Sequence, residues 1–93
     1  MSSDEIIEKI QCLMDDESLN VYHLAIMLAI LQLGYCQRQC EIIYVSRRNI
    51  MKLAHLQSLP TYHKYLKELQ ELGYIEHHPS YHPGYKSTIK LKF

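Results

Sequence analysis

The sequence predicts a mainly α-helical fold with a small β-hairpin, an α+β class. Up to Gly73, apolar residues recur mostly at the three- and four-residue spacing of amphipathic helices. After Gly73 the pattern changes to two short extended segments, and the second, "KSTIKLKF", alternates polar and apolar residues. The stretch "PSYHPGY" between them holds two prolines and a glycine, which suit a connecting loop.

Length and composition limit the classes of protein. A chain of 93 residues, 47% apolar and 22% charged, fits one globular domain over residues 1–93. No apolar run approaches the ~18 residues of a membrane span, and the N-terminus has no apolar leader. We therefore expect a cytoplasmic protein without a membrane segment.

The net charge of zero hides a strong asymmetry. Residues 1–45 hold two bases and seven acids, whereas residues 46–93 hold eight bases and three acids. Such a split indicates a polyanionic partner for the basic half, although scatter over a solvated surface is the alternative.

The first predicted helix begins at Ser2, which with Glu5 has the spacing of a capping box. The helix runs to about Met14, and residues 1–17 form an N-terminal extension. Residues 19–33, "LNVYHLAIMLAILQL", predict a central buried helix in which His23 is a structural histidine. Gly34 ends this helix, or the helix continues toward Gln39.

A short strand is predicted over residues 42–45, because this segment is β-branched or aromatic throughout. Ser46 can cap the next helix, "SRRNIMKLAHL". Arg47, Arg48 and Lys52 lie off its apolar stripe. Since bases in a first turn oppose the helix dipole, their positive charge suggests an external partner.

The last predicted helix spans residues 59–73. Ser58 caps it, Pro60 occupies the first turn, and Gly73 ends it in a left-handed conformation. Residues 74–77 and the final alternating segment then pair as an antiparallel hairpin.

This order of elements resembles the winged helix-turn-helix DNA-binding domains of bacterial transcriptional regulators. The resemblance rests on "SRRNIMKLAHL" as positioning helix, "SLPTYHKYLKELQELGYI" as recognition helix and "EHHPSYHPGYKSTIKLKF" as wing. It implies a winged-helix core over residues 18–93, with the wing at about 74–93. The turn between Ala54 and Thr61 departs from the family, because it lacks the usual glycine.

The resemblance and the helical phase together predict a site for double-stranded DNA. If Tyr62, Leu66 and Leu69 face the core, the polar residues between them face outward, toward a major groove. Wing residues would contact the DNA backbone. The predicted DNA-binding set is Arg47, Arg48, Lys52, Ser58, Thr61, His63, Lys64, Lys67, His78, Tyr81, His82 and Lys86.

Other chemistry has weaker support in the sequence. The odd cysteine count argues against disulfides, and the CxxxC spacing of Cys36 and Cys40 is unusual for zinc, so we expect small hydrophobic filler. His77 and His78 would point to opposite faces of a strand, so no metal site is expected with His82. No catalytic set or cofactor motif appears, and the chain is not expected to be an enzyme. Glu68 and Glu71 are interpreted as solvated partners of Lys64 and Lys67.

Two functions from different classes remain open. The first is a DNA-binding protein, a transcriptional regulator or a factor of a mobile element. The alternative is a winged-helix protein–protein interaction module that does not bind DNA. We also expect a homodimer through the N-terminal helix and part of residues 19–33, because the stripe of Ile6, Ile7, Ile10, Leu13 and Met14 must cover either its own core or a second copy.

Overall fold

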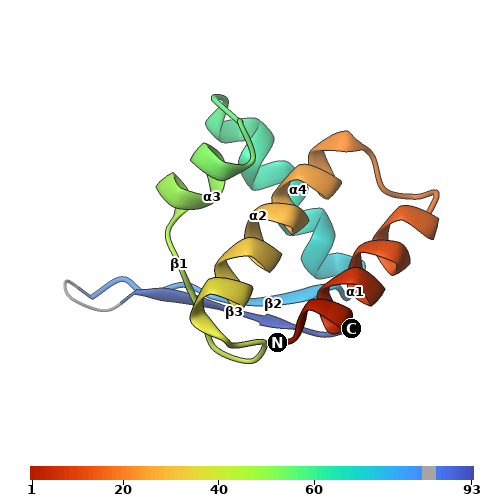
Figure 1. Cartoon of the computed structure of the whole chain (residues 1–93). Helices are drawn as coiled ribbons and strands as arrows, with labels where there is room; N and C mark the ends of the chain where they lie inside the picture. Colours follow the sequence, from red (N-terminus) through yellow and green to blue (C-terminus); the bar gives the residue numbers. More distant parts are fainter. Residues whose placement is uncertain (83–85) are drawn as a thin grey trace.

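Helices lie over a small antiparallel sheet in the computed structural model, which describes residues 1–82 and 86–93 (Figure 1). The elements of these described residues are α1 (Ser3–Asp15), α2 (Val21–Gln37), β1 (Ile43–Val45), α3 (Arg47–Leu53), α4 (Leu59–Glu71), β2 (Ile75–His78) and β3 (Ser87–Leu91). The predicted α+β class and element order are confirmed. The predicted loop includes residues 83–85, which lie outside the described residues.

Each helix begins at a residue whose side-chain oxygen accepts a backbone N–H of the first turn. Ser2, Ser46 and Ser58 do so for α1, α3 and α4, as the sequence predicts. Asn20 caps α2, where His23 completes a capping box by accepting the N–H of Asn20. These caps satisfy donors that no helix can pair internally.

Gly34 lies inside α2 and does not end it. The helix continues to Gln37 and ends at Arg38, whose φ of 55° is left-handed. A Cβ on Gly34 would lie 2.9 Å from the Gln39 carbonyl oxygen and 2.9 Å from Ile43 Cδ1. The glycine is therefore needed for a close approach of the following chain. Of the two ends that the sequence left open, an end at Gly34 is wrong, and the helix continues toward Gln39 as far as Gln37.

The sheet has the order β1-β3-β2, with both neighbouring pairs antiparallel. The predicted hairpin is confirmed, with Ile75 opposite Leu91 and His78 opposite Thr88. Gly73 ends the α4 region with a φ of 85°, also as predicted. β1 pairs with the far side of β3, where Ile43 lies opposite Ile89.

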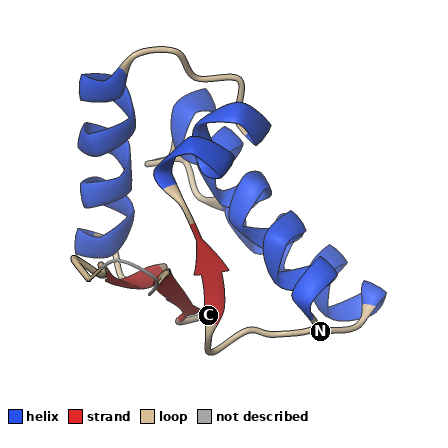
Figure 2. Cartoon of the chain, turned by 90° about the vertical axis from the view of Figure 1, so that its left-hand side faces the viewer, coloured by secondary structure: helices blue, strands red, loops and turns tan. Residues whose placement is uncertain are grey.

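The core lies between the helices and the sheet, and α2 contributes more of its buried residues than any other element in the described residues. Figure 2 shows α4 as the upright helix on the left and α2 as the long inclined helix on the right. The buried apolar residues are Leu13, Ile26, Met27, Ala29, Ile30, Leu31, Ile43, Val45, Ile50, Ala54, Tyr62, Leu66, Leu69, Ile75, Ile89 and Leu91. In the part of the chain that the structure describes, no helix has the length and apolarity needed to cross a bilayer.

The N-terminal helix α1 covers its own core with only part of its apolar stripe. Leu13 is buried, and Ile6 and Ile10 pack against the core. Ile7 and Met14 remain 53% and 71% exposed. The stripe thus serves its own domain on one side and leaves the other side open.

Two local features differ from simple expectation. All three cysteines are free and exposed, so their predicted role as buried filler is wrong. In the turn between Ala54 and Thr61, which has no glycine, His55 adopts a φ of 59°. This left-handed conformation is costly for a residue with a side chain, by about 1–2 kcal/mol.

Candidate nucleic-acid interface

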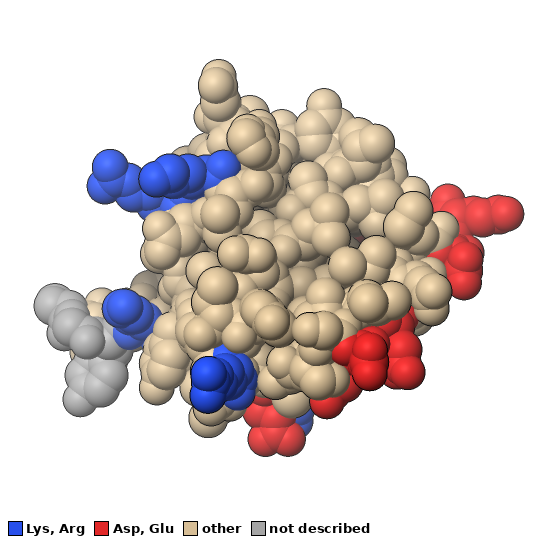
Figure 3. Space-filling view, in the orientation of Figure 1, with Lys and Arg blue, Asp and Glu red and all other residues tan. Residues whose placement is uncertain are grey.

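Positive and negative side chains are unevenly distributed over the molecule. Figure 3 shows Lys and Arg at the left, over α3 and the hairpin, and most Asp and Glu at the right, over α1 and the segment after it. A further basic group lies at the lower edge, over the C-terminal end of α2, with an acidic group beside it. The charge asymmetry between the two halves of the sequence is therefore also an asymmetry in space. A polyanion would be attracted to the α3 and hairpin side and repelled from α1.

The short helix α3 presents the predicted cations Arg47, Arg48 and Lys52 to solvent. Its apolar anchor is Ile50, which is fully buried. Burial raises the pKa of the Tyr62 hydroxyl, and the positive charge of Arg47 opposes that shift. Arg47 thus lies beside α4, at the junction of the two helices.

The outward face of α4 carries the predicted recognition residues. His63, Lys64 and Lys67 are exposed and Thr61 is half-buried, whereas Tyr62, Leu66 and Leu69 are buried, as the helical phase predicts. Lys64 Nζ lies 5.1 Å from the centre of the Tyr65 ring. Lys67 Nζ lies 3.9 Å from Glu71 Oε1, an exposed ion pair of the predicted type. Exposed contacts of this kind contribute little free energy, so both cations remain available to a ligand.

A groove of about 530 Å³ lies between α4 and the hairpin. One wall is formed by residues of α4 at helical spacing, namely His63, Lys67 and Gln70. The other wall and the ends are formed by Arg47, His77, Pro79, Ser80, Tyr81 and Ser87, over a floor of Val45, Tyr62 and Leu66. Cations and hydrogen-bonding groups therefore surround an apolar floor.

His77 contributes a neutral side chain to this groove. Burial lowers the pKa of its imidazole, and the neighbouring His78 lowers it further. A ring with a lowered pKa is uncharged at neutral pH, so His77 offers a hydrogen-bond donor and an acceptor. Sequence reasoning treated His77 only as a metal candidate and missed Gln70 and Ser80. The spacing of His63, Lys67 and Gln70 along one face could have pointed to Gln70.

The remaining predicted site residues lie at several positions. The Ser58 hydroxyl accepts the N–H of Thr61 at 3.4 Å, so it is used as a cap. His78 Nε2 lies 3.6 Å from Glu76 Oε1, and both side chains are largely exposed. Lys86 lines a separate hollow beside Tyr44 and Asn49. Tyr81 is 89% exposed, and His82 is exposed beside it.

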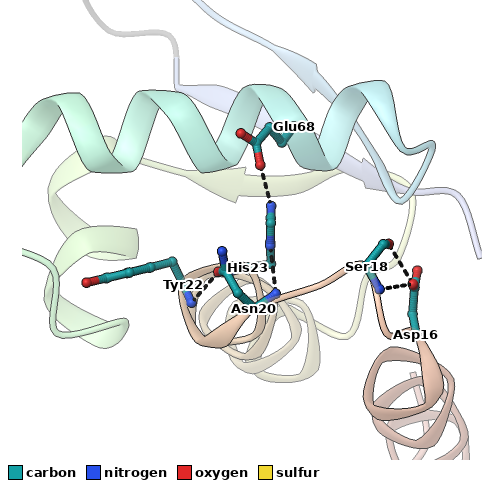
Figure 4. Close-up of polar contacts among 6 residues, drawn as sticks. All are labelled: Asp16, Ser18, Asn20, Tyr22, His23 and Glu68. Atoms are coloured by element: carbon teal, nitrogen blue, oxygen red, sulfur yellow. Dashed lines mark hydrogen bonds and ion pairs between the residues drawn. The ribbon is translucent and has the colours of Figure 1, made fainter.

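Glu68 does not have the role that its spacing suggested. Its carboxylate lies 2.8 Å from His23 Nε2 and so joins α4 to the start of α2 (Figure 4). His23 is only 3% exposed, which confirms its structural role. The interpretation of Glu68 as a solvated partner of Lys64 is therefore wrong.

In residues 1–82 and 86–93, no group of three or more His, Cys, Asp or Glu side chains is arranged to hold a metal ion. His77 faces the groove, whereas the side chain of His78 lies near that of Glu76.

Comparison with known proteins gives no assignment. No protein-family model, curated protein or solved structure matches the chain.

Proposed function

We propose that this chain is a winged helix-turn-helix DNA-binding protein that acts as a transcriptional regulator. In this proposal α3 is the positioning helix, α4 enters the major groove and the β2–β3 hairpin is the wing. The observation that carries the proposal is the groove between α4 and the hairpin, in which Arg47, His63 and Lys67 surround an apolar floor. A helix and a hairpin that flank one cationic groove suit a DNA backbone with a major groove beside it.

The residues have different tasks in this arrangement. His63 and Lys64, near the start of α4, would reach base edges, because both are exposed one turn after the helix begins. Arg47, Arg48 and Lys67 would neutralise phosphates. The hairpin residues Ser80, Tyr81 and Lys86 would position the duplex and carry little sequence information.

The basic first turn of α3 supports the same proposal. Arg47 and Arg48 follow the N-cap Ser46, where the positive end of the helix dipole disfavours cations. A bound phosphate would offset this unfavourable charge. The acids of α1 lie on the other side of the molecule in Figure 3, so they would not face the DNA.

The experiment that tests the proposal is a salt titration of binding to random-sequence duplex DNA, measured by fluorescence anisotropy. Each phosphate contact should contribute about −0.9 to the slope of log K against log salt. Lys67→Ala and Arg47→Ala should each reduce the steepness by about 1. Lys90→Ala is the matched control, because Lys90 is an exposed cation on β3 that lies opposite Glu76, outside the groove.

Sequence reading is tested separately. We expect Lys64→Ala and His63→Ala to weaken binding to a duplex selected for tight binding. The loss should be about 1–3 kcal/mol for each of the two residues that reads a base. Folding would be checked by circular dichroism. Two outcomes would refute the proposal and favour the protein–protein interaction module. One is an affinity for random DNA that does not depend on salt. The other is a loss of affinity in Lys90→Ala as large as the loss in the groove variants.

A further inference from the structure

Helix α2 has an unusual composition for a helix with an exposed side. Its 17 residues include no Asp, Glu, Lys or Arg. A helix that is apolar all round is normally buried on every side. In α2, however, Val21 is 73% exposed, Leu28 is 49% exposed and Tyr35 is 47% exposed.

These three exposed side chains lie seven residues apart, on one line along the helix. The half-buried Leu24 and Ala25 lie between the first two, and the buried Leu31 and the exposed, polar Gln32 lie between the last two. Apolar residues at a seven-residue spacing, with further small or apolar residues three to four positions on, form the seam along which helices pair. We call the line of Val21, Leu28 and Tyr35 the α2 stripe.

An apolar hollow of about 280 Å³ runs beside the α2 stripe, between α1 and α2. Leu28 and Tyr35 form its α2 side, and Ile6, Ile7 and Ile10 form its α1 side. In Figure 3 the middle of the face over α2 shows no coloured Lys, Arg, Asp or Glu side chain, and a basic group lies over the C-terminal end of the helix. The hollow can therefore receive an apolar side chain from a partner helix.

We propose that the α2 stripe pairs with the α2 stripe of a second copy of this chain. A partner for this face must be apolar and uncharged, because a charged partner would lose its hydration without finding an opposite charge. The seven-residue spacing of the α2 stripe suits a partner that is also a helix. The chain's own α2 meets each requirement. The open side of α1, with Ile7 exposed, continues the same surface and lies at its edge.

Two-fold symmetry fixes which residues meet. In a pair of identical helices, the middle residue of the stripe lies nearest the axis, so Leu28 contacts Leu28 of the other copy. The antiparallel arrangement is favoured because it places opposite dipole ends together. Val21 then lies near Tyr35 of the other copy.

This pairing is independent of the proposed DNA binding and compatible with it. In Figure 2 α4 lies on the left of the fold and α2 on the right. The groove between α4 and the hairpin therefore stays open when α2 is covered. A dimer would carry two such grooves, related by the two-fold axis.

The test is sedimentation equilibrium of the full chain and of matched variants. Leu28→Lys places a charge at the centre of the pairing seam, whereas Leu72→Lys makes the same change at a residue that is equally exposed, at 48%, but lies after α4. We expect the unmodified chain and Leu72→Lys to dimerise at micromolar concentration. We expect Leu28→Lys to raise the dissociation constant by about 30-fold or more, since two half-buried leucine contacts are lost.

A second variant guards against loss of the fold. Val21→Glu lies at the first position of α2, where an acid favours the helix dipole, so we expect it to fold and also to weaken the dimer. A chain that stays monomeric at high micromolar concentration would refute the proposal. Equal dissociation constants for Leu28→Lys and Leu72→Lys, with both variants folded, would also refute it. If Leu28→Lys unfolds, a Val21→Glu variant that dimerises as tightly as the unmodified chain would refute it. A chain that stays monomeric and binds a different protein through the α2 stripe would likewise refute pairing with a second copy.

Discussion

Glu68→Ala tests the buried contact that joins α4 to the start of α2. In the structure, His23 Nδ1 accepts the N–H of Asn20 at 2.9 Å, so the ring hydrogen lies on Nε2. That Nε2–H donates to Glu68 Oε1 at 2.8 Å. The variant removes this acceptor and leaves a buried donor without its partner.

The size of the effect follows from the burial of the two side chains. The His23 side chain is 4% exposed, and an unpaired donor at such a site costs about 1–3 kcal/mol. The Glu68 side chain is 36% exposed, so water weakens the charge contribution and favours the lower part of this range. Alanine returns a few tenths of a kcal/mol as a better helix former. We expect a loss of about 1–2 kcal/mol in the free energy of unfolding.

The assay is urea unfolding followed by circular dichroism, with Glu71→Ala as the matched control. Glu71 lies on the same helix, but its contact with Lys67 is exposed and worth about 0.3–0.5 kcal/mol. Thermal unfolding should show a drop of about 4–8 °C per kcal/mol for Glu68→Ala. Equal stabilities for the Glu68 and Glu71 variants would refute the structural role of the His23–Glu68 contact.

Three further outcomes can be measured on the same protein. We expect Gly34→Ala to lower stability by about 1–2 kcal/mol in urea unfolding, although alanine favours helices, because its Cβ would overlap the following chain. At Gly73 an added Cβ meets nothing, so we expect Gly73→Ala to lose only about 1 kcal/mol of stability through the strain of its left-handed backbone. A larger loss at Gly73 than at Gly34 would contradict the steric explanation at Gly34 and the strain explanation at Gly73. Burial and then the hydrogen bond to Asp16 raise the pKa of Tyr74 from 10.0 to about 12. The stability that the protonated hydroxyl contributes is therefore complete below pH 10 and is lost as the pH rises through about 12. Tyr74→Phe cannot titrate at this position, so its free energy of unfolding should lack this loss between pH 10 and 12. Under the proposed DNA binding, Lys86→Ala should lower affinity equally on every duplex, and a loss confined to one sequence would show that the hairpin reads bases.

The element order could be predicted because it depends on local signals. Caps at Ser46 and Ser58, the proline in the first turn of α4 and the left-handed Gly73 each act within a few residues. The phase of α4 followed from its apolar spacing, so the exposure of His63, Lys64 and Lys67 was also predicted. Whether these exposed residues bind DNA stays a prediction.

Features that depend on distant contacts were not predictable. The sequence left open whether Gly34 ends its helix or lies inside it, and only the return of the chain past Ile43 explains its place inside α2. Glu68 has the right spacing to pair with Lys64, but the buried His23 approaches from another helix and takes the carboxylate. His77 joins the groove because the pairing of β2 with β3 turns it toward α4.

The place of β3 in the sheet sets the order in which this protein must fold. β3 comes last along the chain, yet it lies between β1 and β2, and neither of these strands pairs with the other. The helices depend on local contacts and can form early, but Ile43 and Ile75 find their strand partners only when Ile89 and Leu91 arrive. During synthesis on the ribosome, the floor beneath the helices would therefore remain open until residues 87–91 emerge. We therefore expect closure of the long loop between Ile43 and Ile89 to be the slow step, so that substitutions in β3 change the folding rate more than substitutions in the helices do.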